Sequence, residues 1–217
     1  MNCTKPMPTF VMLLALTPLA MAQVKINFDA VTLGELPSGW QAGITGKGQA
    51  NWQVVADDSA PSKPKVLKQS AEATFAWAAK TDVKIADGFV EVKFKPINGN
   101  EDQAGGIVWR FQDANNYYFV RGNAFENNVV LYKTVNAKRS SLQVKGRMFG
   151  YGVDTKVAKG KWNALRVDFK GNLFVVSFNG KKLFEVEDDT LKDAGAVGLW
   201  TKADSVTLFD DFVFGGK

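Results

Sequence analysis

The sequence predicts an all-β protein, a jelly-roll sandwich of two antiparallel sheets, and three observations support this fold class. About a dozen segments alternate apolar and polar side chains with a period of two, as half-buried strands do. Turn-forming residues separate these segments at short, regular intervals. No segment has a sustained helical period, and the nearest candidate, residues 188–194, is long enough for only one or two helical turns.

The predicted strands follow one another without an internal repeat or a low-complexity linker. A Gly- and Pro-containing stretch, 33–52, is expected to be irregular. The strongest hairpin signal is Asn179-Gly180, because Asn-Gly favours a two-residue turn. The predicted strands are 24–29, 52–56, 66–69, 73–77, 88–96, 106–111, 116–122, 128–133, 141–147, 161–170, 173–179, 182–186, 195–201 and 205–214.

The central strands alternate side chains between two faces of a sheet. In 106–111 the expected faces hold Ile107, Trp109 and Phe111 on one side and Val108 and Arg110 on the other. In 116–122 they hold Tyr117, Phe119 and Arg121 on one side and Tyr118 and Val120 on the other. One large aromatic side chain from each strand must fill the core, and we expect these to be Trp109 and Phe119.

Residues 1–22 are predicted to be a secretory signal peptide. Lys5 precedes an apolar run, 10–19, and Ala20-Met21-Ala22 fits a cleavage site. The run is too short to cross a bilayer comfortably. We therefore expect a mature chain, 23–217, that forms one jelly-roll domain in the periplasm or outside the cell, without membrane association after cleavage. The alternative is a buried N-terminal helix.

Composition excludes several classes of function. The chain has no histidine, which rules out His-based acid–base catalysis and His-ligated metals. Its single cysteine, Cys3, lies within the predicted signal peptide, so the mature chain has neither a disulfide nor a thiolate site. The formal net charge of +5 is mild and interspersed along the chain, so nucleic-acid binding is not expected.

The C-terminal half carries motifs that resemble a known fold family. They are Trp162-Asn163, Asn179-Gly180, Gly195-x-Val-Gly-Leu and Phe209-Asp-Asp-Phe, preceded by Gly106-Ile-Val-Trp-Arg-Phe and Asp113-x-Asn-Asn-Tyr-Tyr. With these motifs, residues 85–214 resemble the concanavalin A-like, laminin-G-like jelly rolls of bacterial extracellular proteins. The segment from Phe28-Asp29 to Trp40 is similar to the first strand of this group. Such sequences include family 16 glycoside hydrolases and 3-keto-disaccharide hydrolase-like proteins.

The resemblance implies enzyme motifs that this chain lacks. Family 16 glycoside hydrolases carry Glu-x-Asp-x-Glu, in which alternation puts nucleophile, helper and acid on one face. Here only Glu185-x-Glu187-x-Asp189 is present, with other residue types at the helper and acid positions, so retaining hydrolysis of this kind is not expected. The 3-keto-disaccharide hydrolase-like group shows Asn-Ser-Gly-Ile where this chain has Ala104-Gly-Gly-Ile.

Six side chains of the central region are predicted to bind a ligand. Guanidinium and amide groups give directional hydrogen bonds to sugar hydroxyls, and an arginine fork suits a diol or a uronate. The alternative is a solvated sheet face with surface ion pairs. The predicted ligand-binding residues are Arg110, Tyr117, Arg121, Asn123, Glu126 and Lys133.

Two carboxylates near the chain ends, Asp29 and Asp211, are predicted ligands of a structural calcium ion. Adjacent terminal strands would bring them together, and Ca²⁺ favours carboxylate and carbonyl oxygens. The alternative is an aspartate that caps a turn or accepts hydrogen bonds from the backbone. We expect no other cofactor.

The expected function is non-catalytic recognition of an oligosaccharide or polysaccharide. One alternative is a glycan-active enzyme, either a hydrolase of modified disaccharides or a lyase. The lyase would use Tyr117, Arg121, Lys133 or Arg110 to abstract a proton or stabilise an enolate. The other alternative is an adhesive domain that binds a protein. Fold alone does not distinguish these functions.

Overall fold

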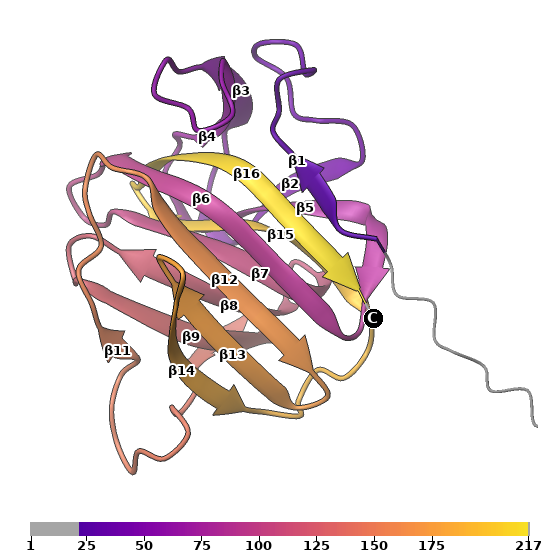
Figure 1. Cartoon of the computed structure of the whole chain (residues 1–217), viewed down its shortest axis with the longest axis vertical. Coiled ribbons are helices and arrows are strands. Elements are labelled where there is room, and N and C mark those ends of the chain that lie inside the picture. The colour runs from indigo at the N-terminus through magenta and orange to yellow at the C-terminus, as the bar shows by residue number, and fades with distance from the viewer. Residues whose placement is uncertain (1–21, 217) are drawn as a thin grey trace, which may run out of the picture.

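The computed structural model describes residues 22–216, which form two antiparallel sheets without a helix (Figure 1). In spatial order the front sheet contains β14 (Lys181–Glu187), β13 (Leu173–Phe178), β12 (Asn163–Lys170), β6 (Gly88–Asn98), β16 (Val206–Gly216), β4 (Lys65–Gln69) and β3 (Trp52–Ala56), with β1 (Val24–Ile26) paired to β16. The back sheet contains β10 (Lys138–Ser141), β9 (Asn128–Val135), β8 (Asn116–Asn123), β7 (Ala104–Asp113), β15 (Gly195–Ala203), β5 (Ala73–Ile85) and β2 (Trp40–Gly48), with β11 (Val153–Asp154) paired to β9.

The predicted fold class, an all-β jelly-roll sandwich, is confirmed. Two local predictions differ from the structure. The stretch expected to be irregular contains β2, and the predicted strand 141–147 ends at Ser141. Except for Ala22, the predicted signal peptide lies outside the described residues. Within residues 22–216 we find no helix with the length and apolar character needed to cross a lipid bilayer.

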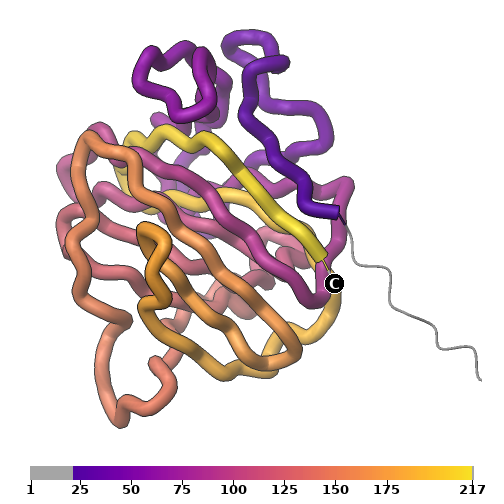
Figure 2. Tube along the Cα trace, viewed as in Figure 1, coloured from indigo at the N-terminus to yellow at the C-terminus, as the bar shows by residue number. Residues whose placement is uncertain are grey.

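The core between the sheets is built from their facing side chains. Val90, Val92 and Phe94 of β6 pack against inward-facing residues of the back sheet, including Ile107 and Trp109. Charged and half-buried residues alternate with these apolar positions along β6, so the outer face of the front sheet meets water. The tube view shows the two layers and the loop between β10 and β11 that projects below them (Figure 2).

The back sheet is buried on both faces, because it curls over its own outer face. Its strands β7, β8, β9 and β15 are buried at almost every position. Thr45 on the edge strand β2 bonds the Tyr117 hydroxyl of β8 at 2.9 Å. Four strand spacings separate β2 from β8, roughly 19 Å in a flat sheet. The side-chain contact therefore requires a strongly concave outer face.

Candidate functional site

Aromatic side chains fill the concave outer face of the back sheet. Phe75 stacks on Trp200 with ring centroids 5.5 Å apart, Trp200 on Phe119 at 4.2 Å, and Phe119 on Tyr132 at 4.7 Å. We call the whole set the outer aromatic cluster. Its members are Phe75, Trp77, Phe111, Tyr117, Phe119, Tyr132 and Trp200. Phe75 is half-buried, so its ring is the most exposed of the set.

Arg139 lies over this cluster from the opposite edge of the sheet. It belongs to β10, and its guanidinium carbon is 4.9 Å from the ring centroids of both Phe75 and Tyr132. Arg139 is exposed, and its guanidinium has no hydrogen-bond or carboxylate partner among residues 22–216. A guanidinium held over aromatic rings keeps its N–H donors available to a ligand that can accept them.

A groove of about 750 Å³ opens beside Arg139. The Phe75 ring forms part of its wall, and Lys47, Glu72, Glu101 and Lys202 supply charged groups around it. The remaining lining residues are Gly48, Gln49, Ala71, Ala73, Thr74 and Ala203. The groove therefore combines one accessible ring with donors and acceptors of both charges.

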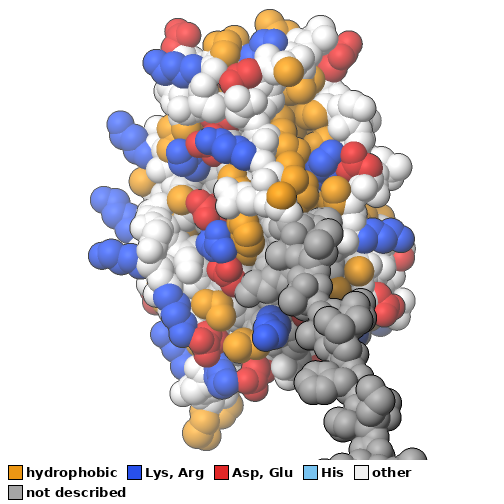
Figure 3. Space-filling view, turned by 45° about the vertical axis from the view of Figure 1, so that its right-hand side comes forward, with side chains coloured by type: hydrophobic (Ala, Val, Ile, Leu, Met, Phe, Trp, Pro, Cys, Tyr) orange, Lys and Arg blue, Asp and Glu red, His pale blue; other side chains and the backbone are white. Residues whose placement is uncertain are grey.

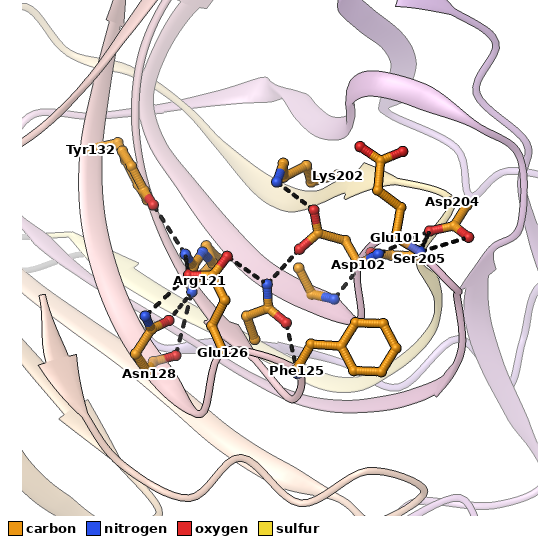
Figure 4. A network of polar contacts seen from close by, with 12 residues as sticks. Glu101, Asp102, Arg121, Phe125, Glu126, Asn128, Tyr132, Lys202, Asp204 and Ser205 are labelled. Carbon is orange, nitrogen blue, oxygen red and sulfur yellow. Dashed lines mark hydrogen bonds and ion pairs between the residues drawn. The ribbon is translucent and has the colours of Figure 1, made fainter. Parts of the chain in front are cut away.

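Next to the groove, Arg121 organises a buried polar network that we call the Arg121 network (Figure 4). Its Nη2 donates to Glu126 Oε2 at 2.8 Å, to the Tyr132 hydroxyl at 3.1 Å and to the Tyr151 hydroxyl at 3.2 Å. Its Nη1 donates to the side chain of Asn128. These contacts occupy the terminal nitrogens of Arg121, so its role is to position Glu126 and the two tyrosines.

The charge states in the Arg121 network follow from burial and from Arg121 itself. Burial favours the neutral form of Glu126, but the Arg121 charge and the hydrogen bonds from Asn128 and Arg121 together hold the pKa of Glu126 below its ordinary value. Burial raises the pKa of Tyr132, against the opposing charge of Arg121. Near neutral pH the network therefore contains the ionised carboxylate of Glu126 beside the protonated phenol of Tyr132.

A second group of contacts joins this network to the groove (Figure 4). Asn123 donates to Asp102 Oδ1 at 2.5 Å and to Glu126 Oε1 at 3.0 Å, and Lys202 forms an ion pair with Asp102. Asp204 holds the loop that carries Asp102, because its carboxylate accepts the backbone N–H groups of residues 100–102. Lys202 thus belongs to both the groove and the network.

The structure brings three of the six predicted ligand-binding residues together and separates the others. Arg121, Asn123 and Glu126 lie in the Arg121 network. Tyr117 is on the same face but fully buried, and burial raises the pKa of its hydroxyl, which bonds Thr45. Lys133 is on the other face of β9, where it contacts Asp188 at 2.7 Å.

Arg110 lies apart from the groove and the Arg121 network. Its guanidinium donates to the backbone carbonyls of Ala86, Leu191 and Gly171 at 2.7–3.0 Å and so ties three loops together. A left-handed backbone at Arg110, with φ of 45°, interrupts the alternation of β7. Phe111 consequently lies on the outer face, not with Trp109 as predicted.

The two predicted calcium ligands have protein partners. Asp211 pairs with Lys25 and with Lys93, each at 2.7 Å. Asp29 accepts the backbone N–H of Lys65 at 3.1 Å. β1 pairs with β16, as expected for terminal strands, but the described residues contain no group of three or more His, Cys, Asp or Glu arranged to hold a metal. Calcium binding stays a prediction.

Sequence analysis missed Arg139, Phe75 and Lys202 as site residues. Phe75 and Trp77 are two residues apart in a predicted strand, a spacing that puts both rings on one face and could have indicated the cluster. The sequence gives no sign that Arg139 lies near these rings, because their proximity depends on the curl of the sheet and not on the local pattern.

Comparisons with known proteins agree with this geometry at the level of fold. A sequence model of the 3-keto-alpha-glucoside-1,2-lyase-like domain matches residues 27–212. No curated protein sequence matches the chain. The carbohydrate-binding module CBM66 from Bacillus subtilis is 18% identical, with a TM-score of 0.63 over 80% of this chain and 93% of that one.

Two β-glucanases have the same fold. The enzyme from Bacillus licheniformis is 12% identical, with a TM-score of 0.56 over 90% of this chain and 98% of its own. A prokaryotic β-1,3-1,4-glucanase (lichenase) derived from a mouse hindgut metagenome is also 12% identical, with a TM-score of 0.54 over 89% and 98% of the two chains. At these identities the likeness establishes the jelly-roll fold alone.

Proposed function

The chain belongs to the 3-keto-alpha-glucoside-1,2-lyase-like family, and from this premise we propose that it binds carbohydrate in the groove beside Arg139. A sugar presents apolar C–H faces and a ring of hydroxyls, so its site needs both a flat apolar surface and directional polar groups. The Phe75 ring and the charged groups around it provide these two elements. The predicted signal peptide would take the protein to the periplasm or the exterior.

The observation that carries this proposal is the guanidinium of Arg139. Two rings fix its position, and its N–H groups have no partner among the described residues. A fixed donor with free N–H groups loses little freedom when it binds the oxygens of a diol or a carboxylate. The structural similarity to CBM66, a carbohydrate-binding module by name, supports the same proposal.

A glycan array with the purified protein tests the proposal. We expect selective binding that Arg139→Ala weakens by about tenfold or more, because one charge-assisted pair contributes about 1.5–3 kcal/mol. Arg166→Ala is the matched control, since Arg166 also stacks on a phenylalanine, Phe89, but on the front sheet. Equal losses in both variants, or no glycan binding by the unmodified protein, would contradict the proposal.

A second candidate function, elimination on a 3-keto-glycoside, is favoured by Glu126. Its side chain is 35% exposed and ionised beside the phenols of Tyr132 and Tyr151. A ketone at C3 makes the proton at C2 acidic, so a carboxylate base can remove it. The C2–H electrons would form the C1–C2 double bond as the C1–O bond breaks, and a phenol would protonate the leaving oxygen.

Incubation with a 3-keto-disaccharide tests this second function. Elimination would release one sugar and leave an enone, which absorbs in the ultraviolet because its double bond is conjugated with the ketone. We expect Glu126→Gln to abolish this product. Glu126→Asp should retain a measurable rate. Full activity of Glu126→Gln would exclude Glu126 as the base. No product from the unmodified protein would exclude the elimination itself and leave the binding proposal standing.

A further inference from the structure

Exposed hydrophobic side chains gather beside the Arg121 network. In the described part of the chain the exposed large hydrophobic residues are Val24, Leu33, Phe125, Met148, Phe149 and Tyr151. Four of these lie on two loops, 124–127 and 142–152, and Met148 and Phe149 are 84% and 82% exposed. Hydrophobic groups that cluster on a surface, unlike scattered ones, mark interaction sites.

Hydrogen bonds join the first loop to the segment that follows the second loop, and they also brace the second loop internally. Thr155, just after the second loop, donates its backbone N–H to the carbonyl of Asn127 at 2.9 Å. Within the second loop, Gln143 donates to the carbonyl of Arg147 at 3.0 Å, and Arg147 donates to that of Gly152 at 3.1 Å. The loop therefore presents its apolar tip in a defined position. Its projection below the sheets is visible in Figure 2, and the corresponding lower end of the space-filling view is a hydrophobic tip (Figure 3).

A buried ring, Tyr132, lies between this apolar surface and the groove. The ring of Tyr151 is 6.0 Å from that of Tyr132, and Tyr132 lies under Arg139 at the groove. On the first loop, Phe125 donates its backbone N–H to Asn123, which also contacts Glu126. Rings and hydrogen-bonding groups thus follow one another from the groove to the loop tip.

We propose that Phe125, Met148, Phe149 and Tyr151 form a platform for the distal part of a long glycan chain, whose first units occupy the groove. This inference rests on the proposed carbohydrate function and adds that the ligand is a polysaccharide. Two features favour a glycan as the occupant over a lipid or a protein. The exposed ring of Tyr151 lies beside polar groups that suit hydroxyls, and Tyr132 joins Tyr151 to Arg139 at the groove.

Binding to chains of different length tests the platform. The probes are starch, β-1,3-1,4-glucan, xylan and polygalacturonate, each compared with a di- or trisaccharide fragment. The variant is the double substitution Met148→Ala and Phe149→Ala, whose side chains are exposed enough that folding should be unaffected. Leu33→Ala is the control, because Leu33 is an exposed hydrophobic residue, 55% accessible, outside the platform. We expect the double variant to bind the polysaccharide roughly tenfold more weakly, about 1.4 kcal/mol, and the short fragment equally well.

The outcomes separate this inference from the proposed function. Polysaccharide binding that the double variant retains would overturn the platform while leaving the groove proposal intact. Absence of binding to both polysaccharide and fragment by the unmodified protein would overturn both. Flotation with vesicles of phosphatidylglycerol and phosphatidylethanolamine is the second readout. Vesicle binding that is lost in the double variant would assign the tip to a lipid surface and overturn the glycan assignment.

Discussion

On each sheet an arginine lies over a phenylalanine ring of the outer face, and these two arginines, Arg166 and Arg139, have different partners. On the front sheet Arg166 lies 3.9 Å from the ring centroid of Phe89, and it donates to the carboxylates of Asp168 and Glu91. On the back sheet Arg139 lies over Phe75, and no carboxylate pairs with it among residues 22–216. The guanidinium of Arg166 is thus paired with carboxylates, whereas the guanidinium of Arg139 keeps free donors. Free donors in a groove, and not the stack itself, identify the candidate site.

Several strands of the two sheets also differ in their pattern of burial. In β6, β12 and β13 of the front sheet, buried positions alternate with half-buried ones. In β7 and β8 of the back sheet nearly all positions are buried. A strand that is buried at consecutive positions has both of its faces covered. In the back sheet the outer face is covered because the sheet curls over it.

The largest expected effect tests whether that second face is a true core. Trp200→Ala should destabilise the protein by about 3–5 kcal/mol, since Trp200 is fully buried and stacks on both Phe75 and Phe119. Phe89→Ala, at the half-buried ring of the front sheet, should cost about 1 kcal/mol. Urea denaturation of both variants measures the difference. Equal costs would mean that the outer aromatic cluster contributes no more than a surface ring.

A smaller effect concerns the charged pair of the Arg121 network. The folded-state pKa of Glu126 is lowered, so its pairing with Arg121 stabilises the protein above the ordinary pKa of 4.5 and is lost as pH falls through the folded-state value. Because a third of this side chain is exposed, screening keeps the contribution below about 1 kcal/mol.

Unfolding free energies between pH 6 and pH 3 measure the contribution of the Arg121–Glu126 pair to stability. The unmodified protein should lose more stability on acidification than Glu126→Gln, which cannot ionise there. Parallel pH profiles would show that the Arg121–Glu126 contact does not stabilise the fold.

The smallest effect is expected at the satisfied arginine. Arg166→Ala should change the unfolding free energy by about 0.5 kcal/mol, because half-exposed ion pairs contribute little. Thermal unfolding at low and high salt measures it, and the difference between the proteins should shrink as salt screens the pair. A loss of more than about 2 kcal/mol of unfolding free energy would show that Arg166 and its contacts contribute substantially to the stability of the fold.

Local pattern was sufficient to predict the sandwich and the two faces of β8. Tyr117, Phe119 and Arg121 do share the outer face, and Tyr118 and Val120 the inner one, because alternation is a local property of the backbone. β2 was missed since its glycines carry no side chains that could show a period. Arg110 was misplaced because one left-handed residue shifts every later side chain of its strand to the opposite face.

The candidate site was predicted only in part for a different reason. Arg121, Asn123 and Glu126 are close in sequence and on one hairpin, so a local analysis could group them. Phe75, Arg139 and Lys202 come from β5, β10 and β15 and meet only because the sheet curls. Curvature depends on bulges and on packing between distant strands, which a linear pattern does not contain.

The residues of the groove are far apart in the sequence, so ligand binding there reports on complete folding. An unfolded chain cannot hold Phe75, Arg139 and Lys202 in one place, so a groove ligand binds the native state alone. By linkage, such a ligand at about 100 times its dissociation constant raises the unfolding free energy by about 2.7 kcal/mol. A rise in melting temperature across a library of sugars would therefore rank candidate ligands directly, whether the bound glycan is cleaved or only held.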